Sequence, residues 1–466
     1  MLSSVGKFFA DKFRRLLPES FIFAILLTFL AAILAMIWVD AKPFGIIQSW
    51  YKGFWSLLAF AMQMVLILVT GYALAISPPI TRFLDWLSTK VRTPVGVYLT
   101  VTFVGLVFNI ISWGWIVLAA VLARELARRV KGVDYRLLAA CVYTTNIIWH
   151  GGLSGSIPLV INTPDNFLIK AGVLDSVIPT STTLLSPMNI AVAILLLIFL
   201  PILMIMLKPR NEDVVEFDDM VDEEHKGAKV VSIEDEADSL RLPDKNLSDF
   251  LNNSFVIQII ISLMGVWYLV WHFATRGFDI NLNIMNFLFI ILGMICHKTP
   301  FRYLIAMKRA CGNVSGIILQ FPFYAGIMGI MIHTGLGKAM AMAIASVATV
   351  GTYPFIAFLI GGFVNIFVPS GGGEWAVVGP TIVEAAKTLG ASMSPDELTS
   401  FIARISMSVG YGDAWTNMIQ PFWTLTFMPI IAAGTKMQAR DFMGYTFMTL
   451  LCAFFIFAIC VTWLPV

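Results

Sequence analysis

Three ionisable residues, His150, Glu374 and Asp413, stand inside or beside polar interruptions of long apolar runs. An ionisable group at membrane depth is costly and is a functional candidate by default, typically in a proton relay or a cation site. Each of the three also has a purely structural interpretation. His150 would be a core histidine with satisfied hydrogen bonds, Glu374 would cap a helix that begins at Trp375, and Asp413 would pair with an arginine such as Arg404.

The sharpest motif is the run Pro369-Ser370-Gly371-Gly372-Gly373-Glu374. Glycines leave backbone N–H groups uncovered, and the start of a helix attracts an anionic group. We therefore expect Ser370, Gly371, Gly372 and Gly373 to bind the carboxylate of a substrate. A flexible loop tip or close helix packing would explain the same glycines. In the first half, Ser112-Trp113-Gly114 is the corresponding but bulkier run, where a packed tryptophan is the alternative.

Two Thr-Asn pairs accompany the ionisable residues. Thr145-Asn146 leads into His150, and Thr416-Asn417 follows Asp413. Hydroxyls, amides and unwound carbonyls within an apolar run can bind a dehydrated cation and a carboxylate, although they also serve interhelical hydrogen bonding. The predicted substrate-binding set contains Asn109, Ser112, Gly114, Asn146, His150, Asn365, Ser370, Gly371, Gly372, Gly373, Thr416 and Asn417. The candidates for ion coupling are Asp413, as first choice, and Glu374, His150 and Thr145.

The composition places these residues in a membrane protein. Of the 466 residues, 58% are hydrophobic and 13% are charged, with a mean hydropathy of +0.83. Soluble domains are about 45–50% apolar and about 25% charged. The net charge of +2 is uninformative, and no basic domain suggests a nucleic-acid partner. The cysteines form no CxxC pair and no Cys/His cluster, so we expect neither a disulfide framework nor a zinc site. No metal triad, HExxH motif or nucleophile elbow is present, so we expect neither an enzyme nor a cofactor, apart from Na⁺ or H⁺ as a coupling ion.

Seven apolar runs are long enough, or nearly so, to cross a bilayer, which takes about 20 residues. The first, near the N-terminus, has no small-residue cleavage site and is predicted to be a retained span rather than a signal peptide. The runs are Phe21–Val39, Leu57–Ile76, Pro187–Leu207, Phe255–Phe273, Asn283–Cys296 with its flanks, Gly316–His333 and Phe442–Leu464. An Asp- and Glu-rich stretch, 208–250, interrupts the pattern and predicts a solvated cytoplasmic linker.

Two further apolar stretches, Val95–Ala127 and Pro354–Ala386, are too long for one helix and carry polar breaks. Each arm is shorter than a full span. Basic residues flank both ends of the first stretch and are scarce around the second, so the positive-inside rule predicts re-entrant hairpins entering from opposite faces. Their tips would lie near the midplane, where irregular backbone is tolerated only beside a polar cavity.

The two halves resemble each other. Asn109-Ile110 matches Asn365-Ile366 at the breaks, and Gln63 and Gln320 precede them at nearly equal distances. Each half then has an arginine followed by a tyrosine (Arg136 and Tyr143, Arg404 and Tyr411) and a Thr-Asn pair. The run 251–275 has no counterpart and inverts the second repeat. We predict an all-α membrane protein of about nine spanning helices and two hairpins. Its parts would be repeat 1–207, linker 208–250, connecting helix 251–275 and repeat 276–466, with a cytoplasmic N-terminus.

The run from Pro369 to Trp375 and the run Gly410-Tyr411-Gly412-Asp413-Ala414-Trp415-Thr416-Asn417 resemble the bacterial short-chain fatty acid (acetoacetate/butyrate) permease family. The resemblance extends over nearly the whole chain and places the family in the ion transporter superfamily. It implies a homodimer in the inner membrane that imports a short-chain monocarboxylate by an elevator movement, coupled to H⁺ or Na⁺. The hairpin tips lack the Ser-Asn-Thr of the divalent-carboxylate branch, which favours a monocarboxylate. A di- or tricarboxylate or amino-acid-like anion transporter, or an anion channel, is the alternative.

Overall fold

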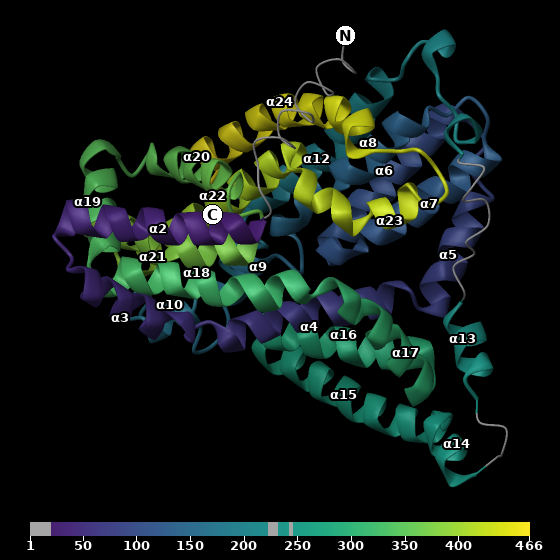
Figure 1. Cartoon of the computed structure of the whole chain (residues 1–466), viewed down its shortest axis with the longest axis horizontal. Coiled ribbons are helices and arrows are strands. Elements are labelled where there is room, and N and C mark those ends of the chain that lie inside the picture. The colour runs from purple at the N-terminus through teal and green to yellow at the C-terminus, as the bar shows by residue number, and fades with distance from the viewer. Residues whose placement is uncertain (1–19, 222–231, 242–245) are drawn as a thin grey trace.

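The computed structural model describes residues 20–221, 232–241 and 246–466, and these form helices without a β-sheet (Figure 1). The first half contains α2 Ser20–Val39, α3 Pro43–Phe54, α4 Leu58–Ala75, α5 Pro78–Ser88, α6 Pro94–Ile111, η1 Trp113–Trp115, α7 Ile116–Arg129, α8 Tyr135–Thr144, η2 Thr145–Gly151, α9 Ser156–Ile161, α10 Phe167–Lys170, α11 Thr180–Thr183 and α12 Pro187–Met206. The acidic segment contains η3 Asn211–Asp213, η4 Asp218–Met220, α13 Ile233–Ser239 and α14 Leu247–Asn252, and leads into α15 Phe255–Arg276.

The second half repeats the order of the first. It contains α16 Leu282–His297, α17 Pro300–Ala310, η6 Cys311–Asn313, α18 Ser315–His333, α19 Leu336–Val347, α20 Tyr353–Asn365, α21 Gly371–Leu389, α22 Pro395–Thr416, η7 Asn417–Ile419, η8 Pro421–Thr426, α23 Met428–Ile431 and α24 Ala439–Trp463. Long helices α2 and α16 are each followed by a short one, and α8 and α22 each end in a 3₁₀ turn. The predicted inverted-repeat architecture is confirmed.

The two halves exchange partners. Helices α2 and α3 pack on α18, and their counterparts α16 and α17 pack on α4. At the α3–α18 crossing, Gly53 and Gly329 allow the backbones to touch, since a Cβ on Gly329 would lie 2.4 Å from the carbonyl oxygen of Ser49. A hydrogen bond of 2.7 Å joins Gln63 on α4 to Asn283 on α16. One group of helices is thus α2, α3, α4, α16, α17 and α18, and most of the remaining helices pack among themselves (Figure 1).

Seven helices in the described part of the chain are long and apolar enough to cross a membrane. Six correspond to the predicted runs, and the run around Asn283–Cys296 forms the shorter apolar helix α16. The seventh is α6, which has 18 residues. The expectation that each hairpin arm is shorter than a span is therefore wrong for this arm. The helix continues through Asn109 to Ile111, and the Asn109 side chain donates to the carbonyl oxygen of Gly105 at 2.9 Å.

Both interrupted stretches fold back on themselves as predicted. Helix α6 packs against α7, and α20 packs against α21. The first turn is at Ser112, whose extended backbone (φ −154°) ends α6, and the second lies between Asn365 and Gly371. Hairpin 1 (α6, η1 and α7) and hairpin 2 (α20 and α21) are the two re-entrant elements of the fold.

One predicted break is in a different place. The run from Gly410 to Asp413 is not unwound, because α22 continues to Thr416 and the 3₁₀ turn begins at Asn417. The glycines serve close packing instead. A Cβ on Gly412 would lie 2.1 Å from the carbonyl oxygen of Phe358, so only glycine lets α22 approach α20 this closely. In the first half the break begins at Thr145, as expected.

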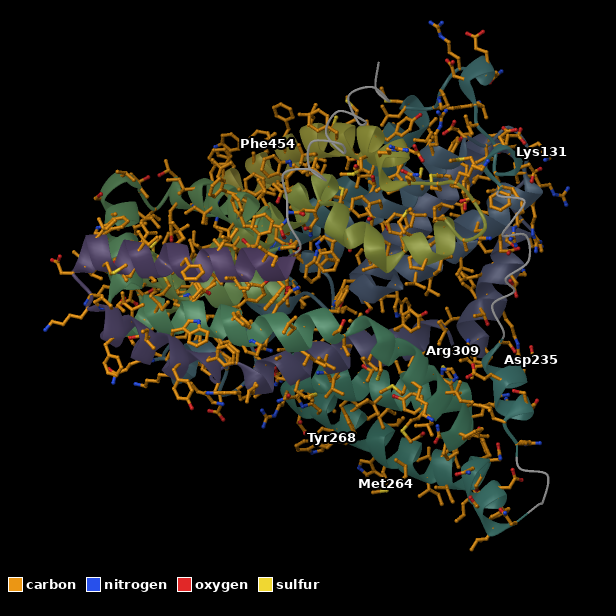
Figure 2. All side chains as sticks on the ribbon, in the orientation of Figure 1. Lys131, Asp235, Met264, Tyr268, Arg309 and Phe454 are labelled. Atoms are coloured by element: carbon orange, nitrogen blue, oxygen red, sulfur yellow. The ribbon has the colours of Figure 1, made fainter. Side chains whose placement is uncertain are left out.

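The acidic segment is bound to the rest of the protein at several points. Lys131, at the end of hairpin 1, bonds to Asp218 at 2.5 Å, which raises the pKa of Lys131. On α13, Glu234 pairs with Arg302 of α17 at 2.9 Å, and Glu236 pairs with Arg309. In Figure 2, Lys131 lies at the upper right and Arg309 lies lower down, close to Asp235 of this segment. The carboxylates that predicted a solvated linker thus also hold it against basic residues of both halves.

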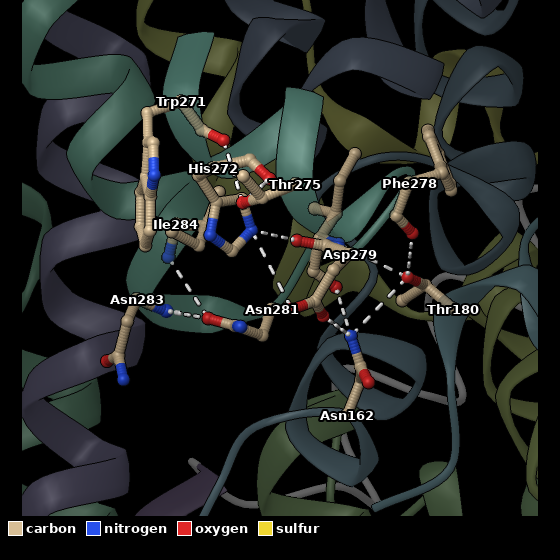
Figure 3. A network of polar contacts seen from close by, with 11 residues as sticks. Asn162, Thr180, Trp271, His272, Thr275, Phe278, Asp279, Asn281, Asn283 and Ile284 are labelled. Carbon is tan, nitrogen blue, oxygen red and sulfur yellow. Dashed lines mark hydrogen bonds and ion pairs between the residues drawn. The ribbon is translucent and has the colours of Figure 1, made fainter. Parts of the chain in front are cut away.

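A polar network fixes the loop between α15 and α16 to the first half (Figure 3). Asn162 donates to Asp279 Oδ1 at 2.8 Å and to the carbonyl oxygen of Ile280 at 3.0 Å. Thr180 donates to the carbonyl oxygen of Phe278 at 3.1 Å, and Nε2 of His272 lies 2.8 Å from the carbonyl oxygen of Asp279. Helix α15, which has no counterpart in the first repeat, is therefore connected through this loop to the segment that follows η2.

Candidate functional site

His150 lies at the centre of the molecule between elements of both halves. It belongs to η2 and is 1% exposed. A Cβ on Gly371, at the tip of hairpin 2, would lie 2.4 Å from the imidazole Nε2, and a Cβ on Gly410 of α22 would lie 3.0 Å from Nδ1. The imidazole is thus in close contact with two glycines of the second half, and a side chain at either position would displace the imidazole or the backbone beside it.

Asp413 is the direct partner of His150. Its Oδ2 lies 2.9 Å from His150 Nε2 and accepts a second hydrogen bond, also of 2.9 Å, from the amide of Asn417. Both ionisable side chains are buried, at 1% and 0% exposure. The alternative pairing with Arg404 is wrong, because the Arg404 guanidinium donates to the carbonyl oxygens of Val461 and Thr462. The structure joins the ionisable residues of the two halves instead.

Glu374 completes the charged centre. It is 0% exposed, and its side chain interacts electrostatically with that of Asp413. Among the described residues, no backbone N–H group donates to either carboxyl oxygen, so the carboxyl does not cap its own helix as that interpretation required. Ser370 fills that role, since its Oγ accepts from Gly373 N at 3.4 Å and its carbonyl oxygen accepts from Glu374 N at 2.6 Å.

The asparagines at the two hairpin breaks make the same bond in each repeat. Asn109 donates to Thr145 Oγ1 at 2.9 Å, and Asn365 donates to Thr416 Oγ1 at 2.9 Å. Nδ2 of Asn365 also donates to the carbonyl oxygen of Asp413 at 2.9 Å and to Asn417 Oδ1 at 2.7 Å. Oxygens that the sequence assigns to a cation site therefore converge on the amide group of Asn365.

The tip of hairpin 2 presents the start of a 19-residue helix. The first N–H groups of any helix have no intrahelical partner. Ser370 satisfies those of Gly373 and Glu374, whereas no bond to a described residue is formed by the N–H groups of Gly371 and Gly372. A Cβ on Gly372 would lie 3.1 Å from Phe60 of α4, and one on Gly373 would lie 2.6 Å from Tyr324 of α18. The tip thus lies where α4 and α18 meet the charged centre formed by His150, Asp413 and Glu374.

The tip of hairpin 1 lies on the other side of the His150 segment. Trp113 N bonds to Ser154 Oγ at 3.0 Å, and Leu153 N bonds to the carbonyl oxygen of Ile110 at 2.6 Å. Ser112 is buried against Gly71, whereas a Cβ on Gly114 would meet nothing closer than 3.7 Å. Gly114 is thus not required by packing. The structure brings both tips to the same segment and places His150 beside the second.

Two residues missed by the sequence prediction support the site from behind. Tyr143 donates to the carbonyl oxygens of Asn417, at 2.6 Å, and Gln420, at 2.5 Å, so a side chain of the first half holds the break of the second. Gln420 donates to the carbonyl oxygens of Asn365, at 2.8 Å, and Ile366, at 2.9 Å. The repeated Arg and Tyr spacing was a signal for Tyr143, although it indicated only the repeat. No sequence pattern indicated Gln420.

Several buried polar atoms of this region have no hydrogen-bond partner among the described residues. Buried polar groups are normally paired, and each exception calls for an explanation such as a bound molecule or water. The atoms are Asn109 Oδ1, Asn146 Oδ1, His150 Nδ1, Asn365 Oδ1, both carboxyl oxygens of Glu374 and Asp413 Oδ1. These atoms are available to a bound molecule or to water.

Inverted repeats with helices broken around a buried polar centre are typical of multi-pass membrane transporters. The sequence comparison is more specific. The chain belongs to the short chain fatty acid transporter family, whose model matches residues 1–464. Transport in a bacterial membrane, rather than enzymatic catalysis, is the activity of this family. The family predicted from the motifs is thereby confirmed.

Two relatives are similar over their whole length. A protein of Escherichia coli K12, named as a candidate short-chain fatty acid transporter, is 38% identical over 99% of this chain and 100% of its own. One of Haemophilus influenzae with the same name is 37% identical over 96% of both chains.

Two solved structures share the fold. Neisseria gonorrhoeae MtrF, described among antimetabolite efflux pumps, has a TM-score of 0.58 at 16% identity over 96% of both chains. The Alcanivorax borkumensis YdaH transporter, described as having an unusual topology, has a TM-score of 0.56 at 15% identity over 96% of this chain and 98% of its own.

Proposed function

We propose that this protein is a carrier for a short-chain monocarboxylate such as acetoacetate or butyrate, driven by a proton gradient. The observation that carries the proposal is the position of His150, which bonds to Asp413 and lies against Gly371 at the tip of hairpin 2. The free N–H groups of Gly371 and Gly372 would bind the substrate carboxylate at a helix N-terminus. The unpaired atoms of Asn109, Asn146 and Asn365 are the next polar partners.

Charge favours a monocarboxylate over a di- or tricarboxylate. No Lys or Arg among the described side chains is buried, so the imidazole of His150 is the basic group nearest to Asp413 and Glu374 within this centre. A substrate with one carboxylate adds one negative charge beside two carboxyls, and a dicarboxylate would add two. Unpaired charges in a low-dielectric interior are strongly disfavoured. The site has no compensating cation for the second charge.

The same charge balance favours protons over Na⁺ for coupling. A carboxylate that enters beside two buried carboxyls is disfavoured unless protons enter with it. His150, Asp413 and Glu374 can carry them. A sodium ion at Asp413 and Thr416 would have to displace the Asn365 amide, whose nitrogen already contacts three oxygens there.

For the movement we propose an elevator mechanism. The scaffold would be the group of helices through which the two halves pack on each other, α2, α3, α4, α16, α17 and α18. The moving body would consist of the two hairpins with α8, α12, α22 and α24. The tip of hairpin 2 contacts Phe60 of α4 and Tyr324 of α18, where the two bodies would slide. We further propose a homodimer in the inner membrane, with the N-terminus and the acidic segment cytoplasmic, and with import as the direction. We also propose that the two repeats comprise residues 1–207 and 276–466.

Counterflow in proteoliposomes tests the carrier. Vesicles loaded with unlabelled acetoacetate should transiently accumulate labelled acetoacetate from outside without an ion gradient, because a carrier exchanges its substrate one molecule at a time. Protein-free vesicles give the background, since short-chain acids cross lipid unaided in their neutral form. Labelled succinate should show no counterflow. Equilibration without overshoot would indicate a channel, and overshoot with succinate would favour the dicarboxylate alternative.

A further inference from the structure

Three tryptophans from three segments meet in the interior. Trp113 comes from the tip of hairpin 1, Trp149 from η2 and Trp423 from η8. Their ring centroids are 6.1 Å apart for Trp113 and Trp149, 5.6 Å for Trp113 and Trp423, and 6.3 Å for Trp149 and Trp423. All three are buried, with exposures of 7%, 2% and 8%. We call this set the tryptophan cluster.

The tryptophan cluster borders the charged centre directly. The rings of Trp149 and His150 are 3.7 Å apart between centroids. A Cβ on Gly371 would lie 2.9 Å from Trp149 Cη2 as well as 2.4 Å from the imidazole of His150. The same point of hairpin 2 therefore touches a polar group and an aromatic ring. A molecule with a carboxylate at one end and an alkyl chain at the other would meet both surfaces here.

Two of the indole groups lack polar partners. Buried tryptophans usually donate their N–H to an acceptor. Trp115, two positions along hairpin 1, donates to the carbonyl oxygen of Gly71 at 2.9 Å. By contrast, Nε1 of Trp113 and Nε1 of Trp149 are buried and have no hydrogen-bond partner in the part of the chain that the structure describes. Trp50 and Trp375 share this property elsewhere, so the unpaired donors alone do not mark a binding site, and the position of Trp149 beside His150 carries the argument.

We propose that the tryptophan cluster binds the alkyl chain of the substrate and sets its maximum length. This inference rests on the proposed transport of a short-chain monocarboxylate. With the carboxylate bound at His150 and the tip of hairpin 2, the chain extends over Trp149 toward Trp113 and Trp423. Each buried methylene improves binding about fourfold while the chain has room. Beyond that length the rings obstruct the chain, because overpacking a filled site is unfavourable.

Affinities of straight-chain acids test the proposal. Dissociation constants of acetate, butyrate, hexanoate and octanoate are measured by calorimetry on the purified full chain in detergent. The wild-type protein should bind butyrate more tightly than hexanoate. In Trp113→Leu and in Trp423→Leu, the ratio of the hexanoate to the butyrate dissociation constant should fall about tenfold or more, because the shortened side chain opens space for methylenes. Trp115→Leu is the matched control, since it removes a buried indole of the same hairpin outside the cluster.

The outcomes separate this inference from the proposed function. If the wild-type protein binds none of the acids, the proposed function itself fails. If it binds butyrate but Trp113→Leu and Trp423→Leu keep the wild-type ratio, or if Trp115→Leu shifts it equally, the cluster is only part of the core and the inference is overturned. Should the leucine variants not fold, Trp113→Phe and Trp423→Phe keep an aromatic ring and should still lower the ratio; an unchanged ratio in both would overturn it as well.

Discussion

In Asp413→Asn, accumulation of acetoacetate against its gradient will be lost, whereas exchange at equal concentrations on both sides will persist. Asparagine keeps the shape of the side chain and can still bond to His150 and Asn417, which contact Oδ2 at 2.9 Å in the native protein. It cannot carry the negative charge that a coupled proton neutralises. Coupling therefore disappears while the binding surface remains. Both quantities are measured with labelled acetoacetate in proteoliposomes, with and without an imposed ΔpH.

Asp396→Asn is the matched control for this variant. Asp396 is an exposed carboxylate in the first turn of the same helix, far along the chain from the charged centre. Its loss should leave accumulation unchanged. If Asp413→Asn accumulates acetoacetate with normal ion dependence, Asp413 has a structural role and another group of the centre, Glu374 or His150, must carry the coupling charge.

Gly371→Ala should lower the transport efficiency, the ratio of maximal uptake rate to KM, by about a hundredfold. Displacing a binding group by about 1 Å commonly has an effect of that size. The added Cβ would lie 2.4 Å from two atoms of the His150 imidazole and 2.9 Å from Trp149, so either the tip or the imidazole must move. Initial rates of acetoacetate uptake over a range of concentrations measure the effect, with thermal unfolding as a check on folding.

Neighbouring glycines provide a graded comparison. The nearest atom to a Cβ on Gly372 is Phe60 Cζ at 3.1 Å, so Gly372→Ala should be impaired less than Gly371→Ala. Nothing lies within 4 Å of a Cβ on Gly312, and Gly312→Ala should transport like the wild-type protein. Equal activity of the alanine variants at 371 and 312 would show that close approach of the tip to His150 is not needed for transport.

The fold was largely predictable because membrane burial imposes strong patterns on the sequence. Apolar runs such as Phe21–Val39 identified the spans, and matched asparagines at positions 109 and 365 identified the repeat. The break near Asp413 was misplaced because glycine has two opposite uses. It can interrupt a helix or allow two helices to touch, and the backbone of α20 against Gly412 decides for the second. Only tertiary contacts distinguish these two uses of glycine.

The site was predictable in its residue types but not in its pairings. The cost of burying charge singled out His150, Glu374 and Asp413, yet the sequence offered Arg404 as the partner of Asp413. Pairing across the repeats depends on how the second half folds over the first, which no local pattern encodes. Gln420 and Tyr143 were missed for the same reason, because they act through backbone carbonyl oxygens of distant segments.

The most direct test of proton-coupled monocarboxylate transport is the initial rate of labelled acetoacetate uptake into proteoliposomes under three conditions: an inward proton gradient, an inward Na⁺ gradient at equal pH, and no gradient. Rates in protein-free vesicles are subtracted under each condition. The account predicts that the proton gradient alone stimulates uptake, by about tenfold or more, as expected when the coupling group must be neutralised for the centre to accept a carboxylate. Stimulation by Na⁺ at equal pH, without an effect of the proton gradient, would contradict it.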